Sequence, residues 1–255
     1  MIPYFQITTI SLGPITFQVW GIMVAIGILA ATAVSAQMAK RRGQDPKLIW
    51  DLSFWVILGA FLFARVFMFF YTPQLYLQDP LEFFKIWHGG LSMMGGLFGA
   101  AVFGILFLRK KKIDVFAHVD TAVFGLPLGI GIGRIGCFLI HDHPGTLTHF
   151  VLGVKYPDGI RHDHGLYLSL NGFILFLLFL WLARKKARTG TYLIVYLLWD
   201  GTTRFLLDFL RATDGLVVDV RYFGLTPAQY FSVLMIGMGI WFFVIPMRFF
   251  VKKIC

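Results

Sequence analysis

Charged residues and cysteines are scarce in this 255-residue sequence. Asp, Glu, Lys and Arg make up only 14% of the chain, whereas 58% is hydrophobic and the mean hydropathy is +0.74. This composition excludes an ordinary soluble domain, in which about a quarter of the residues are charged. The two cysteines, Cys137 and Cys255, have no spacing typical of a disulfide framework or a metal site, so two free thiols are expected.

The N-terminus has no basic residue before its first apolar run, and this run is longer than the core of a signal peptide, so a retained membrane anchor is expected. A helix needs roughly 20 apolar residues to cross a hydrocarbon layer about 30 Å thick. Only helices are expected, because lipid leaves the backbone of an open strand unsatisfied and no run alternates as a barrel strand does. Seven runs meet the length requirement: 15–39, 50–71, 91–108, 117–140, 166–183, 191–210 and 228–247.

The basic residues that give the net charge of +10 cluster after the odd-numbered runs. These clusters are Lys40, Arg41, Arg42 and Lys47; Arg109, Lys110, Lys111 and Lys112; Arg184, Lys185, Lys186 and Arg188; and Arg248, Lys252 and Lys253. The other side has only Lys85, Lys155, Arg161, Arg211 and Arg221. Because short basic loops stay in the cytoplasm, the N-terminus is predicted to be periplasmic and the C-terminus cytoplasmic.

This charge distribution is therefore a topology signal and not a nucleic-acid-binding patch. The predicted fold is all-α, a polytopic protein of the bacterial inner membrane with about seven transmembrane helices. Residues 1–255 are expected to form a single membrane-embedded domain. Residues 141–166 are expected to form a polar periplasmic loop or head segment.

Three arginines lie inside the predicted spans: Arg65, Arg134 and Arg204. A cation at this depth costs at least about 2.5 kcal/mol on insertion scales. Three such residues, in the second, fourth and sixth spans, indicate a polar cavity that holds an anion. The alternative for Arg204 is local neutralisation by Asp200 and Asp208, the latter four residues along the same helix face.

Small residues surround Arg134 in the segment Gly131-Ile132-Gly133-Arg134-Ile135-Gly136-Cys137. Glycines permit close helix packing, but packing does not account for the arginine. A guanidinium presents a rigid fork that matches phosphate oxygens, so a phospholipid headgroup is the expected guest. A second glycine-rich stretch, residues 88–97, opens the third span on the same outer side and is weaker evidence.

Five of the seven histidines fall in the outer connection after the fourth span, among them His141, His143 and His162. Histidine has an unperturbed pKa near neutrality, so general acid or base chemistry is the favoured interpretation. Histidine and carboxylate ligands also suit zinc, and this alternative stays open, although no H-E-x-x-H spacing is present.

The chain resembles the prolipoprotein diacylglyceryl transferase family over nearly its whole length. The matching motifs are Trp20-Gly21, Gly59-Ala60 with Ala64-Arg65, Gly89-Gly90-Leu91-Ser92 with Gly95-Gly96-Leu97, Gly133-Arg134-Ile135-Gly136, Arg161-His162 with Leu166-Tyr167, and Arg204-Phe205 with Phe209 and Arg211. The arginine-centred motif of the fourth span is the most specific. Seven spans with the N-terminus outside also agree with what the family implies.

The resemblance implies transfer of a diacylglyceryl group from phosphatidylglycerol to the lipobox cysteine thiol of preprolipoprotein signal peptides, leaving a thioether and glycerol phosphate. Membrane lipids are the surroundings, no nucleic acid is bound, and no cofactor or metal is required. Arg134 and Arg204 match the family arginines that engage the lipid phosphate, where cations stabilise the departing group. The substrate-binding set is expected to include Arg65, Gly95, Gly96, Asp208 and Arg211, with the active site toward the periplasm.

The chain departs from the family pattern at three of these positions. Met94 stands where the family usually has a histidine proposed as the base, Cys137 replaces a usual asparagine, and Asp208 replaces a usual glutamate. Because thioether formation needs a base to generate the thiolate, a histidine of the outer loop is expected to serve. His141 or His143 is the first candidate and His162 the second.

Two other functions stay open. A divergent family member would use another phospholipid or acceptor, which the missing histidine favours. A transporter for an anionic solute would use the arginines to line its path, but no internal repeat supports two equivalent halves. Acyl-chain preference, the lipoproteins used and the oligomeric state are not specified by the sequence.

Overall fold

A computed structural model of the chain describes residues 1–13, 15–71, 73–79, 81, 92–185, 187–214 and 221–245. Several residues named above lie outside the described residues, namely Gly89, Gly90 and Leu91 of the family motif, Lys85, Lys186, the basic cluster from Arg248 to Lys253, and Cys255. The chain forms two compact units, one of residues 1–38 and 119–255 and one of residues 39–118.

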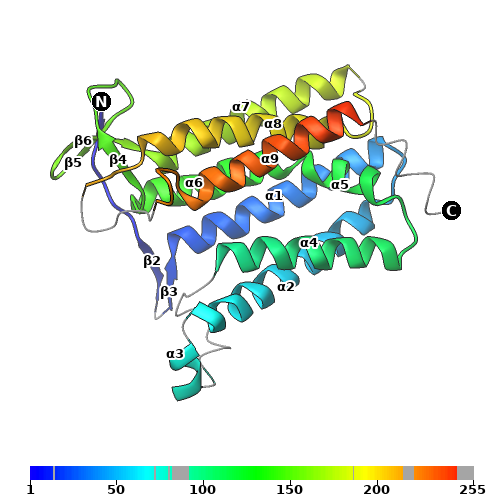
Figure 1. The fold of residues 1–255 in the computed structure, drawn as a ribbon, viewed down its shortest axis with the longest axis horizontal. Helices are drawn as coiled ribbons and strands as arrows, with labels where there is room; N and C mark the ends of the chain where they lie inside the picture. Colours follow the sequence, from blue (N-terminus) through cyan, green and yellow to red (C-terminus); the bar gives the residue numbers. More distant parts are fainter. Residues whose placement is uncertain are drawn as a thin grey trace. The chain divides into compact units, whose positions relative to one another are not determined.

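The first unit contains most of the helices. It comprises α1 (Val19–Arg41, to residue 38), most of α5 (Val115–Val123), α6 (Leu126–Ile140), α7 (His164–Arg184), α8 (Thr191–Leu207), the 3-10 helix η3 (Asp208–Leu210) and α9 (Pro227–Val244). Helix α6 packs on α7, and α8 packs on α9 (Figure 1). Buried side chains from α1, α7 and α8 meet around Phe124 to form an apolar core of Met38, Phe124, Leu175, Phe179 and Tyr192.

Each of the seven predicted spans contains a helix or a helix pair, although residues 15–18 of the first span form strand β3. Four helices are long and apolar enough to cross a membrane, namely α1, α2, α7 and α9, and a fifth span results if the bent pair α5 and α6 is counted as one. Helix α8 has only 17 residues before η3. The chain is therefore a multi-pass membrane protein, whereas the number of seven spans and their orientation stay predictions.

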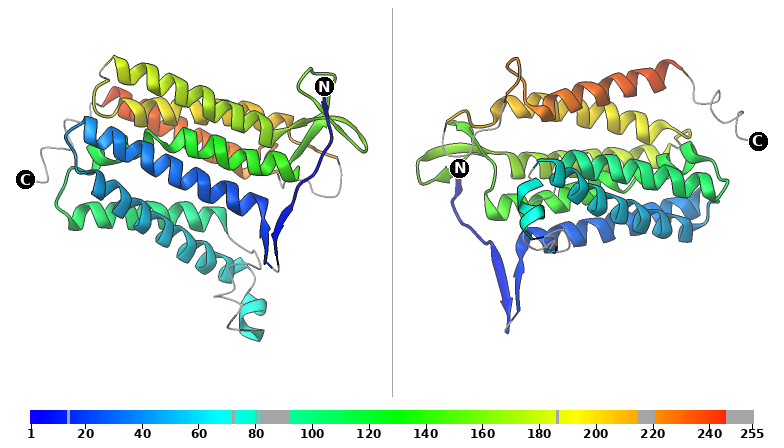
Figure 2. Two further views of the ribbon diagram at one scale, coloured as in Figure 1. Left: turned by 180° about the vertical axis from the view of Figure 1, so that it is seen from behind. Right: turned by 60° about the horizontal axis from the view of Figure 1, so that its bottom comes forward.

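The prediction of an all-α fold omitted two small sheets. Strand β1 (Ile2–Pro3) pairs in parallel with β5 (Val154–Tyr156), β5 forms a hairpin with β6 (Gly159–Asp163), and β4 (Pro144–Leu147) pairs antiparallel with β6. This sheet, here called the head sheet, lies where α6 ends and α7 begins (Figure 2). A separate hairpin joins β2 (Thr9–Leu12) to β3 (Ile15–Gln18).

The expected span 117–140 is broken rather than continuous. Helices α5 and α6 meet at an angle of 42°. Pro127, at the start of α6, has no backbone N–H to donate. Ser35 of α1 stabilises the break, because its Oγ donates to the Ala122 carbonyl oxygen and accepts from the Gly125 N–H, each at 2.9 Å. A hydroxyl thus satisfies backbone groups that lipid would leave unpaired.

The second unit is built on α2 (Pro46–Tyr71) and α4 (Met93–Lys110), with the short α3 (Pro73–Gln78) after α2. Glycines let the two long helices approach each other closely. A Cβ added at Gly95 would collide with the Phe63 carbonyl oxygen, and one added at Gly99 with the Gly59 carbonyl oxygen. This is the close packing that small residues permit between membrane helices.

Candidate active site

Arg134 of α6 and Arg204 of α8 lie half-buried in the same unit. Nη1 of Arg134 donates to Sγ of the buried Cys137 at 3.8 Å. Among the described residues, neither guanidinium has a carboxylate oxygen within the 4.0 Å of an ion pair. The two cations are therefore not sealed by direct carboxylate contacts.

The carboxylate of Asp200 in α8 interacts electrostatically with both Arg134 and Arg204. The side chain is 7% exposed, and two hydrogen bonds hold it, from Asn171 Nδ2 and from Tyr196 Oη, each at 3.4 Å. Both guanidinium groups interact electrostatically with this carboxylate without a direct ion pair, and Asp208, which also acts on Arg204, lies beside Arg211. Such a site favours an anion.

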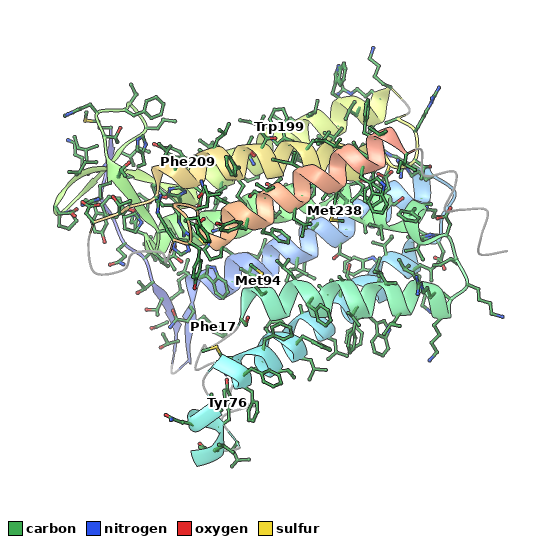
Figure 3. The ribbon with its side chains drawn as sticks, in the orientation of Figure 1. Phe17, Tyr76, Met94, Trp199, Phe209 and Met238 are labelled. Carbon is green, nitrogen blue, oxygen red and sulfur yellow. The ribbon has the colours of Figure 1, made fainter. Side chains whose placement is uncertain are left out.

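Trp199, the residue before Asp200 in α8, orients this polar network (Figure 3). Its Nε1 donates to Asn171 Oδ1 at 2.9 Å, so the amide of Asn171 is oriented with its nitrogen toward Asp200. Thr203 Oγ1 donates to the Trp199 carbonyl oxygen at 2.8 Å. Helices α7 and α8 are thus joined by a chain of polar contacts at membrane depth, next to Arg204.

A groove of about 510 Å³ runs along α7 and α8. Its walls are mostly leucine and isoleucine, and several of these side chains are well exposed, including Leu170, Ile174 and Leu206. Two polar residues of the network described above, Asn171 and Thr203, also line it. The groove therefore offers an apolar surface beside the polar network that holds Asp200.

His162 and Tyr167 line the same groove. The Nδ1 atom of His162 lies 2.7 Å from Oη of Tyr167, within hydrogen-bond distance. Burial lowers the pKa of His162 below its ordinary value of 6.5, because desolvation disfavours the imidazolium. At neutral pH this imidazole is therefore uncharged and able to accept a proton.

His141 is placed quite differently. It ends α6 in the left-handed conformation, with φ at 51°, and its side chain is 0% exposed. Its Nδ1 donates to Oδ2 of Asp163 at 2.7 Å, and Tyr156 Oη donates to the same oxygen at 2.7 Å. The ring stacks on Tyr4 with a centroid distance of 4.9 Å, and the rings of Phe5, Phe138 and Tyr156 meet it edge-on.

His143 lies half-buried, with Nε2 at 3.6 Å from Oδ2 of Asp142. His143 is not among the residues that line the groove. Within the described part of the chain, no group of three or more His, Cys, Asp or Glu side chains has the arrangement of a metal site.

Asp208 and Arg211 lie together just after α8, and their contacts connect neighbouring elements of the fold. Asp208 Oδ2 accepts a hydrogen bond from Thr226 Oγ1, the residue that caps α9, and its Oδ1 lies 3.7 Å from Arg211 Nε. Arg211 also pairs with Gly145 of the head sheet. These two residues connect α8 to α9 and to the head sheet.

Arg65, Gly95 and Gly96 belong to the other unit. Arg65 is 3% exposed, and its Nη1 donates to Tyr76 Oη at 3.2 Å. Gly95 contacts the backbone of α2, whereas Gly96 leaves 3.7 Å between an added Cβ and the Ala60 carbonyl oxygen. Met94, in place of the usual histidine, is half-buried near the start of α4 (Figure 3).

The sequence interpretation treated Asp200 only as a neutralising group, missed Asn171, and named Tyr167 only as part of a family motif without a role. A signal for Asp200 was present, since an ionisable residue inside a span is a functional candidate by itself. Asn171 has the weaker signal of a single amide in an apolar helix. For Tyr167 the signal was its place in the motif that also contains His162.

These observations define a class of protein: a multi-pass membrane protein with two arginines and a carboxylate beside an apolar groove. The profile of the family described as prolipoprotein diacylglyceryl transferase matches residues 7–245. The chain belongs to the prolipoprotein diacylglyceryl transferase family.

Relatives named phosphatidylglycerol–prolipoprotein diacylglyceryl transferase support the assignment over nearly the whole chain. The protein from Chromohalobacter salexigens is 34% identical, with 93% of this chain and 91% of the relative covered. The protein from Pseudoalteromonas atlantica is 36% identical, with 90% and 85% covered. The protein from Staphylococcus xylosus is 32% identical, with 93% and 88% covered.

Proposed function

We propose that the chain transfers a diacylglyceryl group from phosphatidylglycerol to the lipobox cysteine of a preprolipoprotein. The thiolate sulfur attacks the glyceryl carbon, a carbon–sulfur bond forms, and the bond from that carbon to the phosphate oxygen breaks. Glycerol phosphate leaves, and the thiol proton passes to a base. The names of the relatives and the family assignment support this reaction.

Arg134 and Arg204 are the groups proposed to hold the phosphate. The observation that carries this assignment is that both guanidinium groups interact electrostatically with the same buried carboxylate, Asp200, and have no ion pair of their own among the described residues. Negative charge on the phosphate grows as the carbon–oxygen bond breaks, so fixed cations stabilise the transition state more than the bound lipid.

The groove along α7 and α8 is proposed to accommodate an acyl chain of the lipid. Its leucine and isoleucine walls suit a hydrocarbon, and its polar members, Asn171 and Thr203, lie beside the Arg204 network. This arrangement connects an apolar binding surface with the phosphate-binding cations. Arg65, Gly95, Gly96, Asp208 and Arg211 stay predicted members of the substrate-binding set, the last two through the α8–α9 connection.

Among the three candidate bases, geometry favours His162. Its imidazole lines the groove and is uncharged at neutral pH because burial lowers its pKa. His141 has its Nδ1 engaged by Asp163 and its side chain fully enclosed, and His143 faces Asp142. This order reverses the one expected from the sequence, and all three assignments stay predictions.

Helix α7, which starts at the head sheet and ends at Arg184 and Lys185, supports the proposed orientation. Its 21 residues span about 32 Å at 1.5 Å per residue, so the head sheet and this basic cluster lie at opposite membrane faces. Because basic clusters stay in the cytoplasm, we place the head sheet, and with it the active site, on the periplasmic side of the inner membrane.

Mass spectrometry tests the function. A lipobox peptide is incubated with purified protein and phosphatidylglycerol, and the cysteine is expected to gain the mass of a diacylglyceryl group. Parallel reactions with phosphatidylethanolamine or phosphatidylserine distinguish a divergent member, which would transfer from one of these lipids instead. Absence of a mass increment with every lipid would contradict the proposal. Transport of an anionic solute is not proposed, because the family match is to a transferase.

A further inference from the structure

A second groove, of about 720 Å³, lies on α2 and α4 within the unit of residues 39–118. Its polar members come from helix ends: Asp51 is near the start of α2, Lys110 is the last residue of α4, and Lys111 is the C-cap of that helix. The volume falls in the range of about 300–1,000 Å³ that is typical of small-molecule sites.

The floor of this groove is aromatic. The ring of Trp55 stacks on Phe107 with a centroid distance of 6.5 Å and an interplanar angle of 25°, and it lies 6.3 Å from the ring of Phe103. Trp55 remains 40% exposed and the neighbouring Leu106 58% exposed. Phe107, on which this ring packs, is three residues from the end of α4, so the aromatic surface lies close to the basic end of that helix. An exposed tryptophan near the membrane–water interface contacts the upper part of the lipid chains.

The rim of the groove is cationic. Lys110 and Lys111 are both exposed, and Lys111 Nζ lies 5.7 Å from the centroid of the Phe107 ring. Within the described residues, no ion pair joins Asp51 to either lysine. Two ammonium groups face one carboxylate, and Arg109 and Lys112 add further positive charge beside them.

We infer that this groove is a second lipid site, which binds an anionic glycerophospholipid of the membrane leaflet on the side of the basic clusters. The phosphate binds Lys110 and Lys111, the upper acyl chain lies over Trp55 and Leu106, and the Asp51 carboxylate accepts a hydrogen bond from a headgroup hydroxyl. Lysines beside an aromatic surface at a helix end supply both parts of such recognition. The lipid is bound here and not consumed, so the inference does not rest on the transferase reaction.

Lys185 provides a matched control. Its Nζ lies 5.7 Å from the Trp181 ring centroid, the same lysine-over-aromatic arrangement at the end of α7. Neither Lys185 nor Trp181 lines this groove or the α7–α8 groove. Substitution of Lys185 therefore removes the same charge and the same ring contact without touching the proposed site.

Native mass spectrometry of the full chain in detergent tests the inference by titration with phosphatidylglycerol. Wild type and K185Q are expected to retain one more lipid than the K110Q/K111Q double variant, whose apparent affinity for that lipid falls at least tenfold. Trp55→Ala is expected to weaken the same binding step with the charges intact. Phosphatidylcholine and free glycerol phosphate are expected not to occupy the site, which shows that both the anionic head and the chains are required.

Equal lipid retention by the double variant and by wild type would overturn the inference. So would equal binding of phosphatidylcholine and phosphatidylglycerol, or competition by glycerol phosphate. A failure of the transferase proposal is separate, because R134A removes only the lipid at the arginine site and leaves the lysine-dependent step unchanged.

Discussion

His141 and Asp163 form a buried pair in which Nδ1 of the imidazole donates to Oδ2 of the carboxylate at 2.7 Å. The other oxygen of Asp163 accepts from the backbone N–H of Leu166 at 2.9 Å and so caps α7. The pair therefore joins the end of α6 to the start of α7, the helix that carries Asn171. His141, which was expected from the sequence to act as a base, thus forms a hydrogen bond that connects two helices.

His141→Ala is expected to destabilise the protein by about 2–4 kcal/mol, because it leaves a buried carboxylate short of a donor and opens a space among four aromatic rings. The matched variant His143→Ala removes a half-exposed histidine and is expected to change the midpoint of thermal unfolding little. The measurement is thermal unfolding of both variants in detergent. Equal midpoints for H141A and wild type would contradict the assignment.

His162→Gln is expected to lower the rate of transfer at least a hundredfold, the usual contribution of a general base. Because the neutral imidazole is the active form and burial lowers its pKa, wild-type activity should be level near neutrality and fall only as the pH drops below 6.5. The H162Q variant should lose that acidic limb. Persistence of the limb in H162Q would show that another group accepts the proton.

Arg204→Lys is expected to reduce kcat/KM by about a hundredfold or more, because an ammonium keeps the charge but loses the planar fork that binds phosphate. Arg134→Lys should behave alike. Arg188→Ala, which removes a cation of the basic cluster after α7, serves as the control and should retain activity. Transfer kinetics at saturating peptide provide the comparison. Full activity in R204K and R134K, or an equal loss in R188A, would contradict the assignment of the phosphate to these two guanidinium groups.

The head sheet should depend on Arg161, which holds Asp214 through two hydrogen bonds of 3.0 and 2.8 Å and Asp158 through one of 2.9 Å. These hydrogen bonds lower the pKa values of both carboxyl groups below their ordinary 3.8. A depressed folded-state pKa stabilises the fold at pH values above 3.8, and this contribution is lost as the pH falls through the lower folded value.

Arg161→Ala is therefore expected to accelerate hydrogen exchange of the β5–β6 hairpin at pH 7. Arg161→Lys, which cannot form the bidentate pair with Asp214, should do so to a smaller degree. Hydrogen-exchange mass spectrometry of the three proteins is the measurement. Unchanged protection in R161A would mean that strand pairing alone stabilises the sheet.

Hydropathy predicted the helices because lipid exposure requires long apolar runs, and each expected run contains a helix, although the first begins in strand β3. The break at Gly125 was missed because the apolar run continues through it, and only the contact with Ser35 explains how it is tolerated. The strands of the head sheet were missed because they are only two to five residues long, and β1 pairs with a strand about 150 residues away in sequence.

Part of the candidate site was predictable because membrane spans are almost entirely apolar. Arg134 and Arg204 stand out because charge is rare in apolar runs. The different surroundings of His141 and His162 depend on tertiary contacts, such as the pairing of His141 with Asp163 across 22 residues. No local pattern in the sequence specifies which histidine is enclosed and which lines a groove.

The central claim is that Arg134 and Arg204 hold the phosphate of phosphatidylglycerol. Solid-state NMR dephasing between lipid ³¹P and guanidinium ¹⁵N, in protein with labelled arginine and one equivalent of this lipid in zwitterionic bilayers, measures that contact. Strong dephasing is predicted for wild type and for R188A, with loss of the signal in the R134K/R204K double variant. A signal of the same size in the double variant would contradict the account.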